Sequence, residues 1–205
     1  MTEVKPTAII GLGYVGLPLA QAAVDVGIRI IGFDINERAV KQLAAGQSPI
    51  SDIDDDGIAA MLAKGFEPTS DASRLDECGT FIICVPTPLS EDQGPDLTAV
   101  KSAAATLIPH LADGDLVVLE STTYPGTTEE VVAPILAESG LQGQAGFLAR
   151  ARRPRQRHLR NHEHTKGCWW SRRGFKRGRP RLLLTLLRHR GRSQGCARGR
   201  TREAA

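Results

Sequence analysis

The sequence predicts an α/β fold with a doubly wound parallel sheet over residues 1–147 of its 205 residues. In this part, short apolar runs rich in Val and Ile alternate with longer segments in which Ala, Leu and Val recur at helical spacing. The first apolar run leads directly into a glycine-rich turn and a helical segment. This alternation is typical of successive βαβ units, whose strands are parallel and whose helices cover both faces of the sheet.

Four strands are expected, at residues 7–11, 28–33, 81–85 and 116–120. The first (TAIIG) is rich in β-branched residues and stops at glycines, and the second stops at Asp34. The third (FIICV) and the fourth (LVVLE) are apolar runs of strand length. Continuous apolar runs of this kind predict strands that are buried on both faces.

Four helices are expected between and after these strands, at residues 17–26, 37–45, 97–111 and 128–138. Gly27, Gly46 and Gly140 follow three of them, where glycine commonly ends a helix. The acidic residues 51–56 (SDIDDD) are expected to be a loop or a helix start. A solvated helix cap is favoured there over a metal site.

Composition narrows the class of protein. The 41 % apolar and 24 % charged residues are ordinary for a globular chain, whereas 4 % aromatic residues require a core of Val, Ile, Leu and Ala. No apolar run reaches about eighteen residues, so neither a membrane-spanning helix nor a membrane partner is expected. The N-terminus lacks a secretory signal pattern, and the four cysteines lack the spacing of a disulfide scaffold. We therefore expect a cytoplasmic protein.

The net charge of +3 conceals a sharp division of the chain. Residues 1–147 contain 7 Lys and Arg against 21 Asp and Glu, whereas residues 148–205 contain 19 against 2. We therefore expect two parts: a sheet domain over residues 1–147 and a disordered tail, rich in Arg and Gly, over residues 148–205.

The segment GLGYVG, at residues 11–16, has the spacing G-x-G-x-x-G between the first strand and the first helix. In this pattern the first glycine permits a tight turn, the second lets the backbone approach a pyrophosphate, and the third allows the helix to pack closely on the strand. The helix N-terminus adds aligned N–H groups. We expect a Rossmann-like fold whose cofactor contacts include Gly11, Gly13, Tyr14, Val15 and Gly16. A purely structural glycine turn is the alternative.

An acidic residue at the end of the second strand points to NAD. Asp34 lies eighteen residues after Gly16, where a carboxylate can accept hydrogen bonds from both hydroxyls of the adenosine ribose and repel the 2′-phosphate of NADP. Arg38 is expected to lie across the adenine or bridge a phosphate, with an ordinary solvated helix residue as the alternative. NAD is therefore the expected cofactor.

Three segments together resemble one enzyme family: GLGYVGLPLA (11–20), CVPTPLSEDQGPDL (84–97) and LESTTYPGTTEEVV (119–132). They resemble the UDP-glucose/GDP-mannose dehydrogenase family of nucleotide-sugar 6-dehydrogenases. PTPL and ESTTYPGTT are most similar to the branch that oxidises UDP-N-acetylglucosamine or UDP-N-acetylmannosamine. The resemblance covers residues 6–147 and implies the NAD-binding domain of an enzyme whose substrate is a UDP-sugar. A Rossmann dehydrogenase of the 3-hydroxyacyl or 6-phosphogluconate type is the other enzyme considered, and ESTTYPGTT argues against it.

The resemblance also implies roles for three residues that follow strand ends, where open α/β sheets bind ligands. Thr87 would contact the nicotinamide half of the cofactor, and Ser121 would line the same crevice. Thr122 would contact the cofactor and hold the water used in the hydrolytic half of the reaction, and it is the one catalytic residue expected. The alternative is that Thr87 and Thr122 only form side-chain hydrogen bonds within loops.

The family reaction implied by the resemblance oxidises the sugar C6 alcohol to a carboxylate with two NAD+. It requires a cysteine nucleophile, which carries the thiohemiacetal and then the thioester, and a glutamate acid/base in an S-P-E-R segment. Neither motif occurs here, and Cys78, Cys84, Cys168 and Cys196 lie in no matching context. We therefore expect NAD binding without turnover, and we do not expect the homodimer of the family.

The basic tail has competing interpretations. As written, it is a polycationic arm that would bind nucleic acid non-specifically through phosphates, which gives the alternative function of a cofactor domain with a nucleic-acid-binding arm. A metal site at His158, His162, His164 and Cys168 is the least favoured interpretation.

A shifted reading frame explains the tail better. Read one base later, residues 146–156 (GFLARARRPRQ) admit codons for A-F-S-P-E-R-V-D-P-G-N, and residues 163–170 admit N-T-P-K-V-V-G-G. Both segments resemble the family beyond its NAD-binding domain. We therefore expect a frameshift near residues 142–145, either a lesion of the gene or an error in its sequence.

Overall fold

The central strands form at the apolar runs of the sequence. The computed structural model describes residues 5–89, 94–124, 126–139, 146–149 and 169–170. The four expected strands are β1 (Thr7–Ile10), β2 (Ile30–Phe33), β4 (Thr80–Ile83) and β5 (Leu116–Leu119). Every residue in these four strands is buried, which explains why their apolar residues run continuously instead of alternating with polar ones.

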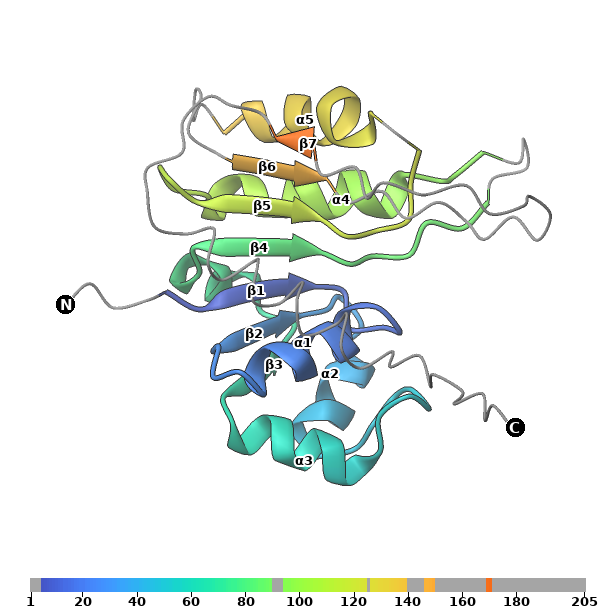
Figure 1. The fold of residues 1–205 in the computed structure, drawn as a ribbon, viewed down its shortest axis with the longest axis vertical. Coiled ribbons are helices and arrows are strands. Elements are labelled where there is room, and N and C mark those ends of the chain that lie inside the picture. The colour runs from blue at the N-terminus through green and yellow to red at the C-terminus, as the bar shows by residue number, and fades with distance from the viewer. Residues whose placement is uncertain (1–4, 90–93, 125, 140–145, 150–168, 171–205) are drawn as a thin grey trace, which may run out of the picture. The chain divides into compact units, whose positions relative to one another are not determined.

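Three further strands complete the sheet: β3 (Phe66–Thr69), β6 (Gly146–Ala149) and β7 (Trp169–Trp170). The strand order is β3-β2-β1-β4-β5-β6-β7, and only the pairing of β6 with β7 is antiparallel (Figure 1). The order reverses direction at β1, which pairs with β2 on one side and β4 on the other. In doubly wound sheets this switch point, at the carboxyl ends of the strands, is where ligands bind.

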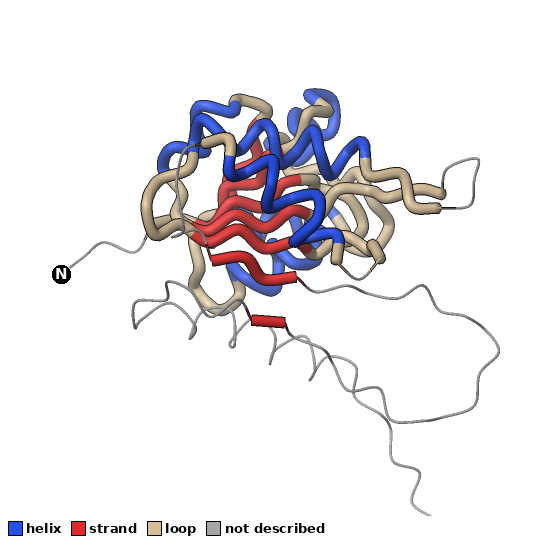
Figure 2. Tube along the Cα trace, turned by 90° about the horizontal axis from the view of Figure 1, so that it is seen from above, coloured by secondary structure: helices blue, strands red, loops and turns tan. Residues whose placement is uncertain are grey.

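Helices lie on both faces of the sheet (Figure 2). In chain order they are α1 (Gly16–Val24), α2 (Glu37–Ala44), α3 (Asp55–Ala63), α4 (Thr98–Leu107) and α5 (Ala133–Ala137). Short 3₁₀ helices occur at Ala72–Glu77 and Ile108–His110, and a π-helical turn at Thr128–Val132 leads into α5. Helix α1 contacts β1, β2 and β3. Alternate strand residues form one core cluster with α4 and α5: Ala8, Ile10, Ile31, Phe33, Phe81, Ile83, Val117 and Leu119.

The fold class predicted from the sequence is confirmed. Helix α3 forms where only a loop or helix start was expected, and the sheet differs from the prediction at its edges. Strand β3 is not predicted, because Phe66 is its only buried residue and the strand contains Pro68. Strand β6 crosses the expected boundary at residue 147 and pairs with β5. Apart from residues 148–149 and Trp169–Trp170, the predicted tail lies outside the described residues, as does Gly140.

No helix in the described part of the chain is both long enough and apolar enough to cross a bilayer.

Candidate functional site

The glycine turn lies at the switch point, between β1 and α1. Gly11 has a φ of +93°, and a Cβ there would lie 3.0 Å from the carbonyl oxygen of Cys84. A Cβ on Gly16 would lie 1.8 Å from the carbonyl oxygen of Gly11, so α1 packs directly on the turn. A Cβ on Gly13, in contrast, would meet no atom within 4 Å. The fold therefore requires the first and third glycines, while the second borders open space that a phosphate can approach.

The first turn of α1 can bind an anion. Its N-cap residue, Val15, makes no side-chain capping hydrogen bond, whereas Asn36 caps α2 and Asp54 caps α3. Tyr14, just before it, is 63 % exposed. An N-terminus without a side-chain cap leaves backbone N–H groups for an external acceptor, and the helix dipole favours a negative charge there. Together with the open space at Gly13, this N-terminus fits the pyrophosphate of a dinucleotide.

The backbone holds the carboxylate of Asp34 at the carboxyl end of β2. The N–H of Leu12 donates to Oδ2 at 2.8 Å, and the N–H of Asn36 donates to Oδ1 at 2.9 Å. Each carboxylate oxygen can accept a further hydrogen bond. The two oxygens can therefore still accept hydrogen bonds from the two hydroxyls of a ribose. Arg38, on α2, is exposed and forms no ion pair with any other described residue.

Leu12 is a residue of this site that the sequence does not single out. Its amide connects the glycine turn to Asp34, and its side chain is only 2 % exposed. The variable positions of G-x-G-x-x-G carry no constraint of their own, so the motif gives no reason to select Leu12. An apolar residue between the first two glycines of the motif is the one available signal.

Two side-chain hydrogen bonds join the loops that follow β4 and β5. The hydroxyl of Ser121, which is 3 % exposed, donates to the carbonyl oxygen of Val85 at 2.8 Å, and the hydroxyl of Thr87 donates to the carbonyl oxygen of Thr122. The hydroxyl of Thr122 is half-buried and makes no hydrogen bond within the described part of the chain. Thr87 therefore forms a side-chain hydrogen bond between loops, which was the alternative to a cofactor contact. Its hydroxyl oxygen can still accept a hydrogen bond from a ligand.

Neither cysteine of the described residues is placed as a nucleophile. Cys78 and Cys84 are both buried, and burial raises the pKa of the Cys78 thiol to about 12. A thiol must ionise to attack a carbonyl, so Cys78 is inert at neutral pH.

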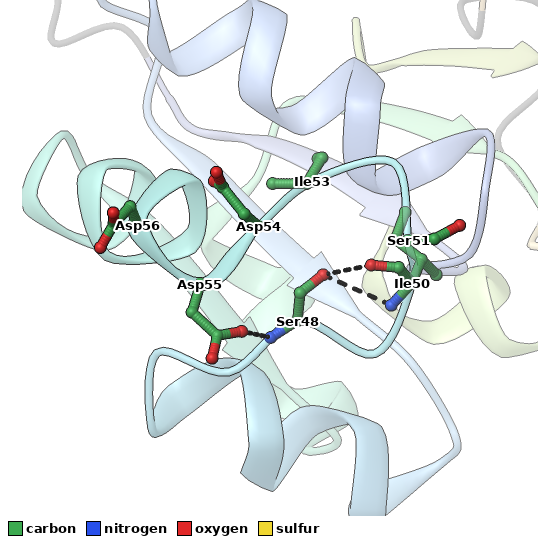
Figure 3. Close-up of a pocket in the computed structure, with 7 residues that line it drawn as sticks. All are labelled: Ser48, Ile50, Ser51, Ile53, Asp54, Asp55 and Asp56. Atoms are coloured by element: carbon green, nitrogen blue, oxygen red, sulfur yellow. Dashed lines mark hydrogen bonds between the residues drawn. The ribbon is translucent and has the colours of Figure 1, made fainter.

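The acidic residues 51–56 act mainly at a helix terminus. Asp54 accepts from the N–H of Gly57 at 2.8 Å and caps α3, and Asp55 accepts from the N–H of Ser48 at 2.8 Å. Figure 3 shows the side chains of Asp54 and Asp55 beside a pocket that Ser51 and Ile53 also line. Among the described residues, no three His, Cys, Asp or Glu side chains are grouped so that they could hold a metal ion. The alternative metal site at His158, His162, His164 and Cys168 lies outside them.

Known proteins that are similar to this chain belong to one enzyme family. The family model for the NAD-binding domain of the UDP-glucose/GDP-mannose dehydrogenase family matches residues 5–149. The chain is 41 % identical over 154 residues to UDP-N-acetyl-D-glucosamine 6-dehydrogenase of Pseudomonas aeruginosa, covering 73 % of this chain and 35 % of that protein. A UDP-N-acetyl-D-mannosamine dehydrogenase of Methanococcus maripaludis is 36 % identical over 139 residues, covering 65 % of this chain and 32 % of the relative.

Solved structures give the same result. A UDP-D-ManNAc dehydrogenase from Pyrococcus horikoshii superposes with a TM-score of 0.66 at 32 % identity, covering 73 % of this chain and 36 % of that one. These relatives are dehydrogenases, so they give no support to the nucleic-acid-binding alternative. The chain spans about a third of the length of the curated relatives that it matches. The chain belongs to the UDP-glucose/GDP-mannose dehydrogenase family and contains that family's NAD-binding domain.

Proposed function

We propose that the domain binds NAD+ across the switch point. The pyrophosphate lies on the open side of Gly13, against the N–H groups at Tyr14 and Val15, with Gly11 and Gly16 shaping the turn. The adenosine ribose donates its hydroxyls to Asp34, and Arg38 lies beside the adenine or a phosphate. The observation that carries this proposal is the pairing of an uncapped helix N-terminus with a carboxylate whose backbone bonds leave acceptor capacity on both oxygens.

The nicotinamide half is assigned to the loops after β4 and β5. Thr87 and Ser121 hold these loops together through hydrogen bonds to the neighbouring loop. The hydroxyl of Thr122 makes no hydrogen bond within the described residues and is suited to hold a water molecule. We propose contacts with the cofactor for all three residues and a catalytic, water-holding role for Thr122.

The whole protein to which such a domain belongs is proposed to oxidise the C6 alcohol of a UDP-sugar to a carboxylate, as a step toward polysaccharide precursors. Bound NAD+ supplies the hydride acceptor. The names of the relatives support an N-acetylated hexosamine as the sugar. The cytoplasm, where nucleotide sugars are made, is the proposed compartment.

The chain as given is proposed to bind NAD but not to catalyse the family reaction, and it is proposed not to form the family's homodimer. None of its four cysteines lies in a segment that resembles the family's nucleophile motif, and no S-P-E-R segment occurs in its sequence. The domain is proposed to be residues 1–147, which β6 extends to Ala149. Residues 148–205 are proposed to be read out of frame, since a single shift admits codons for both S-P-E-R and N-T-P-K-V-V-G-G.

The proposed reaction can be tested with two chains, the 205-residue protein and a frame-corrected product of the resequenced gene. With UDP-N-acetylglucosamine or UDP-N-acetylmannosamine, the corrected chain is expected to form two NADH per sugar, and the 205-residue chain none. Thr122→Val should lower the rate of the corrected chain about tenfold or more. Thr106→Val is the matched control, because Thr106 is a half-buried threonine on α4 whose hydroxyl bonds only within that helix. A shifted frame that soon stops, or a corrected chain that leaves both sugars unchanged, would reject the proposed reaction.

A further inference from the structure

Gly32 lies within β2, the strand between β3 and β1, where no turn or positive φ calls for a glycine. It is a buried residue of β2, paired with Ile9 of β1 and with Pro68 of β3. Glycine inside a strand weakens it, and it often marks a site where another group approaches closely. The position therefore requires a separate explanation.

The space above Gly32 is filled from the glycine turn. A Cβ on Gly32 would lie 2.8 Å from Cδ2 and 3.1 Å from Cδ1 of Leu12, and 2.7 Å from the ring edge of Phe66. The Leu12 side chain, 2 % exposed, is thus seated directly on the backbone of β2. The same residue donates its N–H to Asp34, two residues beyond Gly32 on the same chain segment. The contact with Gly32 fixes the side chain of Leu12, and the hydrogen bond to Asp34 is made by its backbone amide.

We propose that Gly32 is a positioning residue for cofactor binding: its missing side chain forms the seat that anchors Leu12 and thereby orients the carboxylate of Asp34. The anchored Leu12 holds its N–H toward Oδ2 of Asp34. The remaining acceptor capacity of that carboxylate then faces the ribose hydroxyls. This inference rests on the proposed role of Asp34 in ribose binding and adds the residues that set its orientation.

The test compares ADP with 2′-deoxy-ADP as calorimetric probes of the full chain. Only ADP offers the 2′-hydroxyl to Asp34, so the ratio of the two dissociation constants reports the orientation of that carboxylate. Gly32→Ala forces Leu12 from its seat and is expected to weaken ADP binding about tenfold. Binding of 2′-deoxy-ADP should weaken less, because that probe retains only the 3′-hydroxyl bond to Asp34. The ratio should therefore fall toward one.

A second variant keeps the proposal testable if Gly32→Ala folds poorly. Leu12→Val removes the two terminal methyl positions that contact Gly32 without adding bulk to the core, and it should also lower the ratio. The double variant, with Gly32→Ala and Leu12→Val, restores a complementary contact. It should recover much of the ratio lost in either single variant, which a general loss of stability would not produce.

A matched control uses the other neighbour of Gly32. The double variant with Gly32→Ala and Phe66→Leu relieves the Phe66 contact instead of the Leu12 contact. If this variant restores the ratio and the double variant with Gly32→Ala and Leu12→Val does not, Gly32 serves core packing alone and the proposal is wrong. An unchanged ratio in both single variants, or equal losses for ADP and 2′-deoxy-ADP, would also overturn it. Absence of ADP and NAD+ binding by the unmodified chain would instead reject the cofactor site itself.

Discussion

Asp34→Asn is the substitution that most directly separates charge from shape at the cofactor site. The carboxylate now accepts backbone bonds at 2.8 Å and 2.9 Å and is proposed to accept both ribose hydroxyls. An asparagine of the same shape has one acceptor oxygen and one donor group. One ribose bond is then lost and the other loses its charge assistance, a cost of about 2–3 kcal/mol in binding. We therefore expect the dissociation constant for NAD+ to rise about 30- to 150-fold.

The same substitution should reduce discrimination against NADP+, because it removes the negative charge that repels the 2′-phosphate. Calorimetric titration of both nucleotides into both proteins measures the two effects. Asp25→Asn is the matched control, since Asp25 is an exposed carboxylate paired with Lys64 at 2.7 Å, just after α1, and its loss should leave both affinities unchanged. An Asp34→Asn protein that binds NAD+ as tightly as the unmodified chain would refute the assignment of Asp34 to the ribose.

Three further predictions concern the glycine turn, the buried thiol of Cys78 and the hydrogen bonds between Asp96 and Thr98. Gly16→Ala should lower the melting temperature by more than about 10 °C, because its Cβ would meet backbone at 1.8 Å, whereas Gly13→Ala should leave melting unchanged and weaken NAD+ binding about tenfold. Peptide mapping after iodoacetamide treatment at pH 8 should find Cys78 unmodified in the folded chain and modified in guanidinium. The reason is that burial raises the pKa of the Cys78 thiol to about 12. Rapid modification of Cys78 in buffer would contradict its burial. The hydroxyl and N–H of Thr98 lower the pKa of Asp96, so the stabilisation it provides is present above the ordinary aspartate pKa and lost as the pH falls through the lowered value. Asp96→Asn should therefore flatten the dependence of the melting temperature on pH between about pH 5 and pH 2, and an unchanged slope would count against a role for the Asp96–Thr98 hydrogen bonds.

The centre of the sheet could be predicted from the sequence because it is buried on both faces. A four-residue run such as Thr7–Ile10 or Leu116–Leu119 has no polar face to interrupt it, so its apolar letters alone mark it as a strand. The glycine spacing then identifies the turn, since only glycine fits at Gly11 and Gly16. The fold class follows from these local requirements, whereas the cofactor also needs Asp34 and the family also needs the segments at residues 84–97 and 119–132.

Features that depend on contacts between distant segments could not be predicted. Strand β3 is held by pairing with β2, and its own sequence, FEPT, has no strand pattern. The bond from Leu12 to Asp34 joins residues 22 positions apart, and the seat on Gly32 becomes visible only when the turn folds back over β2. The partners of Ser121 and Thr87, in the same way, lie on a neighbouring loop.

Titration of the 205-residue protein with NAD+ and NADP+ tests most directly whether this chain binds NAD+ at the carboxyl ends of β1, β2, β4 and β5. We expect one NAD+ per chain with a dissociation constant in the micromolar to millimolar range, and NADP+ bound at least about tenfold more weakly. No heat of binding with NAD+ up to about ten millimolar, from a chain that melts cooperatively, would contradict the claim. Equal binding of the two nucleotides would contradict the role of Asp34.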